Sequence, residues 1–409
     1  MFPVLEIFSS WWLLPLILSI LGLFLSLWIV ISAPTYFLLP LGVGAPEISP
    51  WLIVINASAL LVTVWVQKGW WTNLILVCSL LGLILSLLPL LQFPSVNRQF
   101  NLEMERVLGT DYLQDVPEAV KAKMRSKPLA IADVFRGISV PKVRISRGMV
   151  FASPDEVDLK LNTYRPLAVG KYPTLIIIYG GAWRQGSPNG HEQFSSYIAA
   201  QGYSVITIDY RHAPQYRFPA QLEDVETALQ YIGDRAEELE VDTDKMIIMG
   251  RSAGGHLAKL AAYREATAFR GVISYYGPTN LTEGYYDLPV PDPIDIQAVL
   301  QDFLGGTPEQ LPELYIQASP INYIYPNLPP SLLIYPGRDR LVQVKFGREL
   351  YAKLKATNNP AIFLEIPWAE HAFDTVFFGV SNQLTLYYTE RFLASTLKID
   401  RKVGKFPKL

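Results

Sequence analysis

Cysteine and histidine are scarce in this chain of 409 residues. The only cysteine, Cys78, excludes an intrachain disulfide and a cysteine-rich metal site. Since there are four histidines, a reaction that needs a histidine base has few candidates for it. The formal net charge of -2 provides no basic excess, so the sequence does not predict a nucleic-acid partner.

Charge is almost missing from the first 97 positions. The charged residues there are Glu6, Glu47 and Lys68. They leave three uncharged, apolar stretches at 11–31, 48–67 and 70–91. Each is close to the roughly 20 residues that cross a bilayer. Tryptophans gather near the ends of these stretches, where interfacial anchors are common. We therefore predict three transmembrane helices within residues 1–92, a multi-pass membrane protein, and the lipid bilayer as a partner.

A cleaved signal peptide is the alternative explanation for the first stretch. It is disfavoured because no basic segment precedes the run, the run is long, and two more follow. Three spans would put the two ends of the chain on opposite sides of the membrane. Arg98 and Arg106 follow the third stretch, whereas Lys68 lies between the second and third. This small excess of positive charge predicts that the C-terminal part is cytoplasmic.

The period of the hydrophobic pattern changes twice after the apolar region. Residues 93–136 are predicted to be a connector with cap helices, in which FNLEMERVLG places Phe100 and Met104 on one side and Gly109 ends the helix. In 137–409, short strand-like runs alternate with amphipathic helices. That alternation predicts an α/β fold with a mostly parallel sheet and helices on both faces. A cap-like insertion at 278–328, with one clear helix near 295–303, interrupts it.

A strand-like run, a small-residue turn and a helix-like run surround Ser252. The turn reads GRSAG, with KMIIM before it and HLAKLAAYR after it. This order is typical of a nucleophile elbow, in which a strained strand-to-helix turn exposes the serine hydroxyl at the top of a sheet. A glycine-rich turn before an ordinary helix is the alternative. The flanking runs favour the elbow, and we predict that Ser252 is a nucleophile.

Small residues also follow the strand-like run YPTLIII, in the sequence YGGAW at 179–183. An acyl-transfer nucleophile needs backbone N–H donors for the oxyanion, one from the residue after the serine and others from an earlier loop. Consecutive small residues leave such N–H groups unshielded. Gly180, Gly181 and Ala253 are therefore the candidate oxyanion hole. A tight turn after a buried strand is the alternative.

The order serine, acid, histidine, which accompanies such an elbow, restricts the choice of base. His191 and His212 precede Ser252. His256 lies four residues after it on the same helix, so it would point away and pack. His371 follows the last strand-like run on a loop, and we predict that it is the base.

Two aspartates compete for the role of the acid that orients the histidine. Asp339 follows the strand-like run SLLIYP, and Asp374 lies three residues after His371. Asp374 is too close in sequence to reach the imidazole from behind without a special turn. Asp339 is therefore favoured.

Residues 172–373 resemble the hormone-sensitive-lipase-like group of α/β-hydrolases, which is related to small bacterial carboxylesterases. YGGAW resembles the oxyanion loop HGGGW of that group, and DYRHAPQYRFPAQLED at 209–224 resembles its DYRLAPE…FPA…D block. GRSAGGHLA matches the elbow, while GRDRLV and EHAF match the acid and histidine loops. The resemblance implies an α/β-hydrolase fold with Ser252, Asp339 and His371 as the triad and Gly180, Gly181 and Ala253 as oxyanion donors.

Two departures from the pattern of that group are visible. Tyr179 stands where the group has a supporting histidine, and Ala182 replaces the third glycine. The second change alters the space beside the acyl group, so it bears on substrate range. Asp224 corresponds to a structural helix residue of the group and is left outside the site.

These features predict a membrane-anchored serine esterase or lipase that needs no metal or cofactor. The anchor points to an ester substrate that partitions into lipid, and the insertion to its acyl pocket or lid. An acyltransferase, a prenylcysteine methylesterase-like enzyme with the same triad, and a non-catalytic binding module are the alternatives. Acyl-chain length, head group and oligomeric state are not determined by the sequence.

Overall fold

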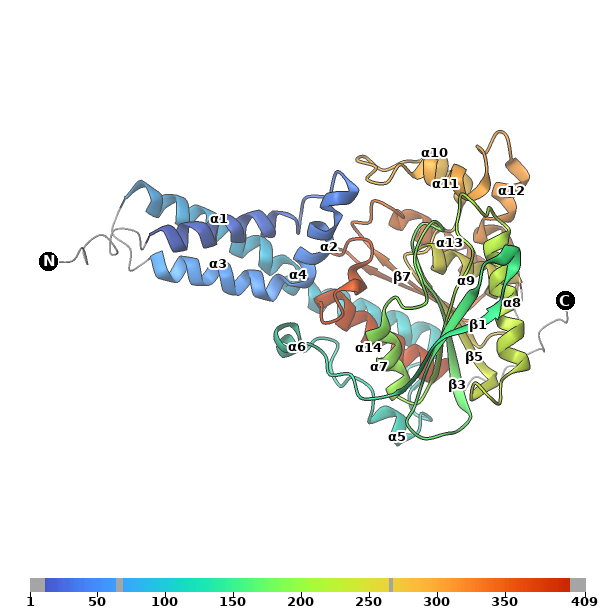
Figure 1. Ribbon diagram of the computed structural model, residues 1–409. Coiled ribbons are helices and arrows are strands. Elements are labelled where there is room, and N and C mark those ends of the chain that lie inside the picture. Colours follow the sequence, from blue (N-terminus) through green and yellow to red (C-terminus); the bar gives the residue numbers. More distant parts are fainter. Residues whose placement is uncertain (1–11, 64–68, 265–267, 398–409) are drawn as a thin grey trace.

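The computed structural model describes residues 12–63, 69–264 and 268–397. It has two parts: a slender helical bundle near the N-terminal end, and a larger part in which helices surround a sheet (Figure 1). The end of the bundle abuts the larger part, so the chain forms one elongated molecule.

An eight-stranded sheet forms the centre of the larger part, in the order β1-β2-β4-β3-β5-β6-β7-β8. The strands are β1 (Arg144–Ala152), β2 (Leu159–Arg165), β3 (Tyr172–Ile178), β4 (Ser204–Ile208), β5 (Val241–Arg251), β6 (Gly271–Tyr275), β7 (Ser331–Pro336) and β8 (Ala361–Ile366). β2 is antiparallel to β1 and β4, and the strands from β4 to β8 are parallel. The predicted α/β class with a mostly parallel sheet is confirmed.

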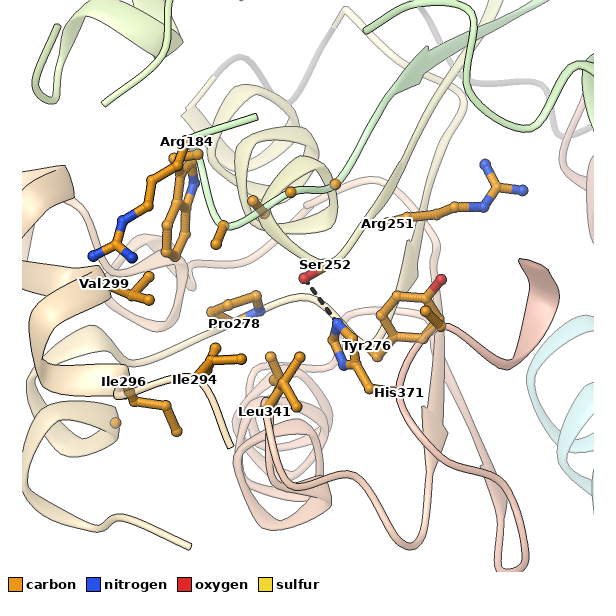
Figure 2. A pocket seen from close by; sticks show the side chains of 18 of the residues that line it. Arg184, Arg251, Ser252, Tyr276, Pro278, Ile294, Ile296, Val299, Leu341 and His371 are labelled. Atoms are coloured by element: carbon orange, nitrogen blue, oxygen red, sulfur yellow. Dashed lines mark hydrogen bonds between the residues drawn. The ribbon is translucent and has the colours of Figure 1, made fainter. Parts of the chain in front are cut away.

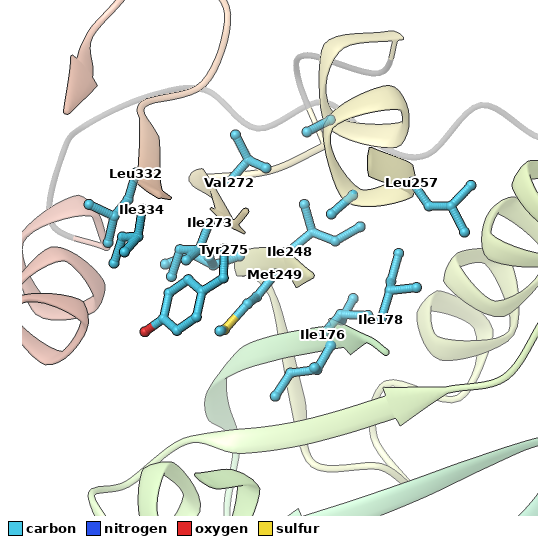
Figure 3. Packing of buried hydrophobic residues seen from close by; sticks show 14 of the residues in the cluster. Ile176, Ile178, Ile248, Met249, Leu257, Val272, Ile273, Tyr275, Leu332 and Ile334 are labelled. Carbon is cyan, nitrogen blue, oxygen red and sulfur yellow. The ribbon is translucent and has the colours of Figure 1, made fainter. Parts of the chain in front are cut away.

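Helices cover both faces of the sheet, as a parallel sheet requires. α7 (Glu192–Ala200) and α14 (Val380–Thr396) lie on one side, and α8 (Ala220–Asp234), α9 (Ala253–Arg264) and α13 (Val344–Ala356) on the other (Figure 1). Because no face of the central strands meets water, these strands are apolar along their length. Ile176, Ile248 and Val272 are adjacent across β3, β5 and β6 and are buried in this core (Figure 3).

The insertion after β6 contains more helix than the sequence predicted. α11 (Ile296–Leu304) is the predicted helix, and it is joined by α10 (Leu281–Tyr286), α12 (Pro312–Gln317) and the 3-10 turn η4 (Pro320–Tyr323). The two missed helices have six residues each. That length is too short for a helical period to be visible in the sequence.

The N-terminal bundle consists of α1 (Leu13–Leu27), α3 (Ser49–Thr63) and the first part of α4 (Trp70–Leu108). A 3-10 turn, η2 (Tyr36–Leu38), and the short helix α2 (Leu39–Glu47) connect α1 to α3 at the end nearest the sheet.

Three transmembrane helices were predicted, and the described residues give a smaller number. Among the described residues, α4 is the one helix that is long and apolar enough to cross a membrane. The number of possible spans rises to two if η2 and α2 are counted together with α3 as one span, although a bend of 79° separates them. α1 has 15 residues, fewer than a bilayer crossing needs. Residues 1–11 lie outside the described chain. Lys68, on which the predicted orientation rested, also lies outside it.

The predicted boundary between residues 92 and 93 falls inside a helix. α4 runs without interruption for 39 residues, from the bundle onto the sheet. It continues because Phe93, Val96, Phe100 and Met104 repeat at helical spacing and are buried in the core of the larger part. The helix ends at Leu108, and Gly109 follows with a φ of 90°, as the sequence predicted. The connector then forms α5 (Glu118–Lys121) and α6 (Ile131–Arg136).

The inside of the bundle is rich in small and polar residues, and many large apolar residues lie on its outside. The buried positions include Ser19, Gly22 and Ser26 on α1, Asn56 and Ala59 on α3, and Ser79, Gly82 and Ser86 on α4. The exposed positions include Leu14, Ile17, Leu61, Val77, Leu80 and Ile84. A Cβ added to Gly22 or Gly82 would lie within 2.4 Å of the Asn56 side chain, so the three helices approach as closely as glycine permits.

Candidate active site

Ser252 occupies a sharp turn between β5 and α9. Its φ is +50°, a region that L residues rarely adopt. A Cβ on Gly250 would lie 2.0 Å from the Gly254 carbonyl oxygen, and a Cβ on Gly254 would lie 2.1 Å from that of Ile178. These approaches explain why GRSAG has glycine at both ends: strand, turn and helix pack too closely for any larger residue. The turn leaves the hydroxyl of Ser252 at the edge of a pocket.

His371 and Asp339 lie in a line behind Ser252. The Ser252 Oγ is 3.0 Å from Nε2 of His371 (Figure 2). On the other side of the imidazole, Nδ1 of His371 is 2.7 Å from Oδ2 of Asp339. The other carboxylate oxygen of Asp339 accepts the backbone N–H groups of Leu341 and Val342, each at 2.8 Å. The loops after β7 and β8 therefore present the acid and the imidazole in a fixed orientation toward the turn after β5.

Asp374, the competing aspartate, faces a different partner. Its carboxylate accepts hydrogen bonds from the side chains of Arg251 and Tyr276, all of them buried. Burial raises the pKa of Asp374, but the charges of Arg251 and His191 and the hydrogen bonds from Tyr276 and Arg251 together outweigh burial and keep the pKa below its ordinary value. Asp374 thus neutralises the arginine that precedes Ser252. The imidazole Nδ1–H of His371 donates to Asp339 instead.

The remaining histidines are held by other groups. His256 accepts the indole N–H of Trp183 at Nδ1, 3.2 Å, so its Nε2–H donates to the carbonyl of Ala318 at 2.6 Å. Burial lowers the pKa of His256 to about 3, so it packs as a neutral ring. His212 lies 2.9 Å from the hydroxyl of Tyr179, and His191 lies 3.7 Å from the carboxylate of Asp374.

The candidate oxyanion residues Gly180, Gly181 and Ala253 line the same pocket as Ser252. A Cβ on Gly180 would lie 3.0 Å from that of Ser252, so the glycine loop lies against the turn. Gly181 has a φ of +137°, and a Cβ there would lie 1.9 Å from the carbonyl oxygen of Gln185. Ala253 is the first residue of α9, so its N–H has no acceptor within the helix.

Tyr179 precedes this loop and belongs to a separate polar cluster. Its hydroxyl donates to the carboxylate of Asp209 at 2.5 Å, and its ring stacks on Tyr210 with centroids 4.5 Å apart. Burial, followed by the nearby Tyr210 and Asp209, raises the pKa of Tyr179 above its ordinary range. Tyr179, which stands where the resembling group has a histidine, therefore holds the start of the glycine loop through this cluster.

The sequence did not predict a role for Glu370, whose carboxyl group lies behind the triad in addition to those of Asp339 and Asp374. It is buried and accepts the backbone N–H of His371 at 3.0 Å and that of Arg340 at 3.3 Å. Burial and the charge of Asp339 raise the pKa of Glu370 to about 7. Its position beside His371 in EHAF was visible in the sequence, but its burial depends on how two distant loops meet.

The pocket in front of Ser252 has a volume of about 830 Å³. Its walls come from the insertion, the loop after β7, the glycine loop and, unexpectedly, the segment between α1 and α3, which contributes Tyr36 and Leu39. Ile294, Val299 and Leu341 face the space beside Ser252 (Figure 2). Arg184 also reaches the pocket, and its charge is paired with Asp302 at 2.8 Å. No signal in the sequence pointed to Tyr36 or Leu39.

Comparison with known proteins identifies relatives of the larger part. The BD-FAE family model matches residues 161–354. The chain is 32% identical over 223 residues to Esterase LipC of Mycobacterium tuberculosis, covering 49% of this chain and 53% of that protein. It is 30% identical over 223 residues to the probable carboxylic ester hydrolase LipM of the same organism, covering half of each. The chain thus spans about half the length of these curated relatives.

Solved structures share the fold. A Rhizomucor miehei esterase matches with a TM-score of 0.55 and 21% identity, covering 68% of this chain and 91% of that one. EstE1, a thermostable carboxylesterase from a metagenomic library, matches with a TM-score of 0.55 and 21% identity, covering 76% and 98%. At this identity the likeness concerns the fold. Together with the mostly parallel sheet, it identifies the fold as that of the α/β-hydrolases, as expected.

Proposed function

We propose that this chain is a carboxylic-ester hydrolase in which Ser252 is the nucleophile, His371 the base and Asp339 the acid. The observation that carries the proposal is the continuous hydrogen-bonded line from Ser252 Oγ through His371 to Asp339, with distances of 3.0 and 2.7 Å. The esterases among the relatives support the same activity.

The reaction has two halves. His371 Nε2 takes the hydroxyl proton as Ser252 Oγ bonds to the ester carbonyl carbon, and the carbonyl π electrons move to its oxygen. When the tetrahedral intermediate collapses, the C–O bond to the alcohol breaks and His371 returns the proton to the leaving oxygen. Water then attacks the acyl-enzyme in the same way, which releases the carboxylic acid and regenerates Ser252.

We assign the oxyanion to the backbone N–H groups of Gly180, Gly181 and Ala253. Ala253 lies at the N-terminus of α9, where unpaired N–H groups and the helix dipole favour negative charge. Removing one such donor from a hydrolase costs about 3 kcal/mol of transition-state stabilisation. Asp339 holds the Nδ1–H tautomer of His371, which leaves Nε2 free to take the proton.

We further propose that the N-terminal bundle lies in a lipid bilayer. Its outer faces carry large apolar side chains, among them Leu14, Ile17, Leu61 and Val77. In water such a surface would promote aggregation, whereas in a bilayer it contacts the lipid hydrocarbon chains. The small residues between its helices are those that let membrane helices approach closely. The cytoplasmic location of the larger part remains a prediction, which protease access in sealed vesicles would test.

Hydrolysis of a chain-length series of nitrophenyl esters by the detergent-solubilised full chain tests the activity. We expect hydrolysis that Ser252→Ala abolishes. If wild type and Ser252→Ala were equally inactive on every ester, the hydrolase proposal would fail. Adding an alcohol acceptor to the same assay and measuring the new ester would reveal acyl transfer by the same triad.

A further inference from the structure

The segment between α1 and α3 belongs to the pocket as much as to the bundle. Tyr36 and Leu39 line the same cavity as Ser252 and His371. Both residues lie far outside the part matched by the BD-FAE family model, which begins at residue 161. One wall of the pocket therefore comes from the N-terminal region of the chain.

Contacts on two sides hold this segment over the pocket. The backbone N–H of Tyr36 donates to the carbonyl of Pro293 in the insertion, at 3.1 Å. Leu39 packs in an apolar cluster with Ala33 and Val43, and Leu341 from the loop that carries Asp339 lies against that cluster.

The loop that carries Asp339 is also bound to the end of α1. Arg338 donates to the carbonyl of Trp28 at 3.2 Å, and Arg340 donates to the hydroxyl of Ser32 at 3.3 Å. The position of the segment relative to Ser252 is therefore set by hydrogen bonds and packing to both the insertion and the acid loop.

Large apolar side chains are exposed on the two segments that meet here. Phe37, next to Tyr36, is 87% exposed, and Val290, three residues before Pro293, is 86% exposed. Tyr286 on α10 is exposed as well. These segments lie beside the end of the bundle that faces the sheet (Figure 1). Phe37 and Val290 are therefore close in sequence to Tyr36 and Pro293, which line the pocket and are hydrogen-bonded to each other.

We infer that the pocket takes an ester with a long apolar acyl chain directly from the bilayer surface. The acyl chain lies between Leu39 from the N-terminal region and Ile294 and Leu341 from the larger part, and the ester carbonyl faces Ser252. Figure 2 shows Ile294 and Leu341 beside Ser252. Phe37 and Val290 insert among the lipids and bring the entrance to the membrane. This inference rests on the proposed hydrolase activity and names the substrate class of that site.

The test compares two esters on the full chain reconstituted in phosphatidylcholine vesicles. One is nitrophenyl palmitate carried in the vesicles, and the other is nitrophenyl acetate dissolved in water. Phe37→Glu with Val290→Glu places two charges where apolar contact is expected. We expect the ratio of palmitate to acetate hydrolysis to fall roughly tenfold or more, because burial of two large apolar side chains is lost.

Two further variants control for general effects of the substitution. Val169→Glu, at a position 81% exposed on the loop between β2 and β3, should leave the ratio unchanged. Phe37→Leu with Val290→Leu keeps the apolar surface and should show the wild-type ratio of palmitate to acetate hydrolysis. An unchanged ratio in the double glutamate variant, or an equal fall with Val169→Glu, would overturn the inference.

Leu39→Trp provides a second measurement, which does not depend on whether the Phe37→Glu, Val290→Glu double variant folds. A larger side chain at this wall should shift the preference toward shorter acyl chains in an acetate-to-palmitate series. An unaltered chain-length profile would refute the role of Leu39. If the wild-type chain hydrolyses neither ester, the proposed function itself fails. If it hydrolyses both through Ser252 while neither variant alters the preference, only the present inference fails.

Discussion

Replacing each of the two competing aspartates by asparagine separates their roles. In Asp339→Asn, the amide oxygen can keep the two backbone N–H donors that Oδ1 now accepts, from Leu341 and Val342. The amide nitrogen then faces Nδ1 of His371, 2.7 Å from the present Oδ2 position. Two N–H donors cannot face each other, so Nδ1 must become the acceptor and the proton moves to Nε2. His371 then cannot take the proton of Ser252.

The expected loss from this wrong tautomer is about 10⁴-fold in kcat, as measured for the equivalent change in another serine hydrolase. At about 1.4 kcal/mol for each factor of ten, this corresponds to roughly 5 to 6 kcal/mol of transition-state stabilisation. Because the geometry of the pocket is preserved, KM should change little.

Asp374→Asn should behave differently. It removes the negative partner of the buried Arg251 and leaves the bond between Asp339 and His371 in place. Loss of one member of a buried ion pair costs about 3 to 5 kcal/mol of folding stability. We expect a marked fall in melting temperature and a kcat, per folded molecule, within about tenfold of wild type.

Release of nitrophenol from a short ester, normalised by titration of reactive serine, measures kcat for both variants. Differential scanning fluorimetry in detergent measures their melting temperatures. The reasoning is refuted if Asp339→Asn keeps more than a tenth of wild-type kcat, or if Asp374→Asn loses as much kcat as Asp339→Asn.

Three further outcomes are expected. Gly181→Ala, whose Cβ would meet the Gln185 carbonyl at 1.9 Å, should displace the glycine loop and lower kcat about 10²-fold or more, and a normal kcat would exclude this loop as the oxyanion site. The pKa of Glu370 is raised from 4.5 to about 7, so between these pH values the folded chain holds a proton that the unfolded chain releases. The free energy of unfolding should therefore fall as pH rises from 4.5 to 7. Glu370→Gln should flatten this part of the profile of melting temperature against pH, and an unchanged slope would contradict the raised pKa. Gly82→Val should clash with Asn56 and lower the melting temperature in detergent without altering the triad, a result that the same fluorimetry and ester assay would check.

The local pattern of the chain was enough to predict much of the fold. Strands that are covered on both faces are apolar along their whole length, and amphipathic helices repeat with a period of 3.6, so β3, β5 and α13 were visible in the sequence. The end of α4 at Gly109 followed from the same local chemistry. The short helices α10 and α12 could not be predicted, because six residues do not complete two turns.

For the candidate site, the order of the motifs along the chain led to Ser252, Asp339 and His371 as a set, and their roles remain a proposal. Which aspartate faces the imidazole was decided by the tertiary structure, because it depends on the paths of two loops and on the buried Arg251 that engages Asp374. The burial of Glu370 and the contribution of Tyr36 and Leu39 to the pocket have the same origin. A hydrophobic period records which face of an element is covered, but it carries no information about which distant segment covers it.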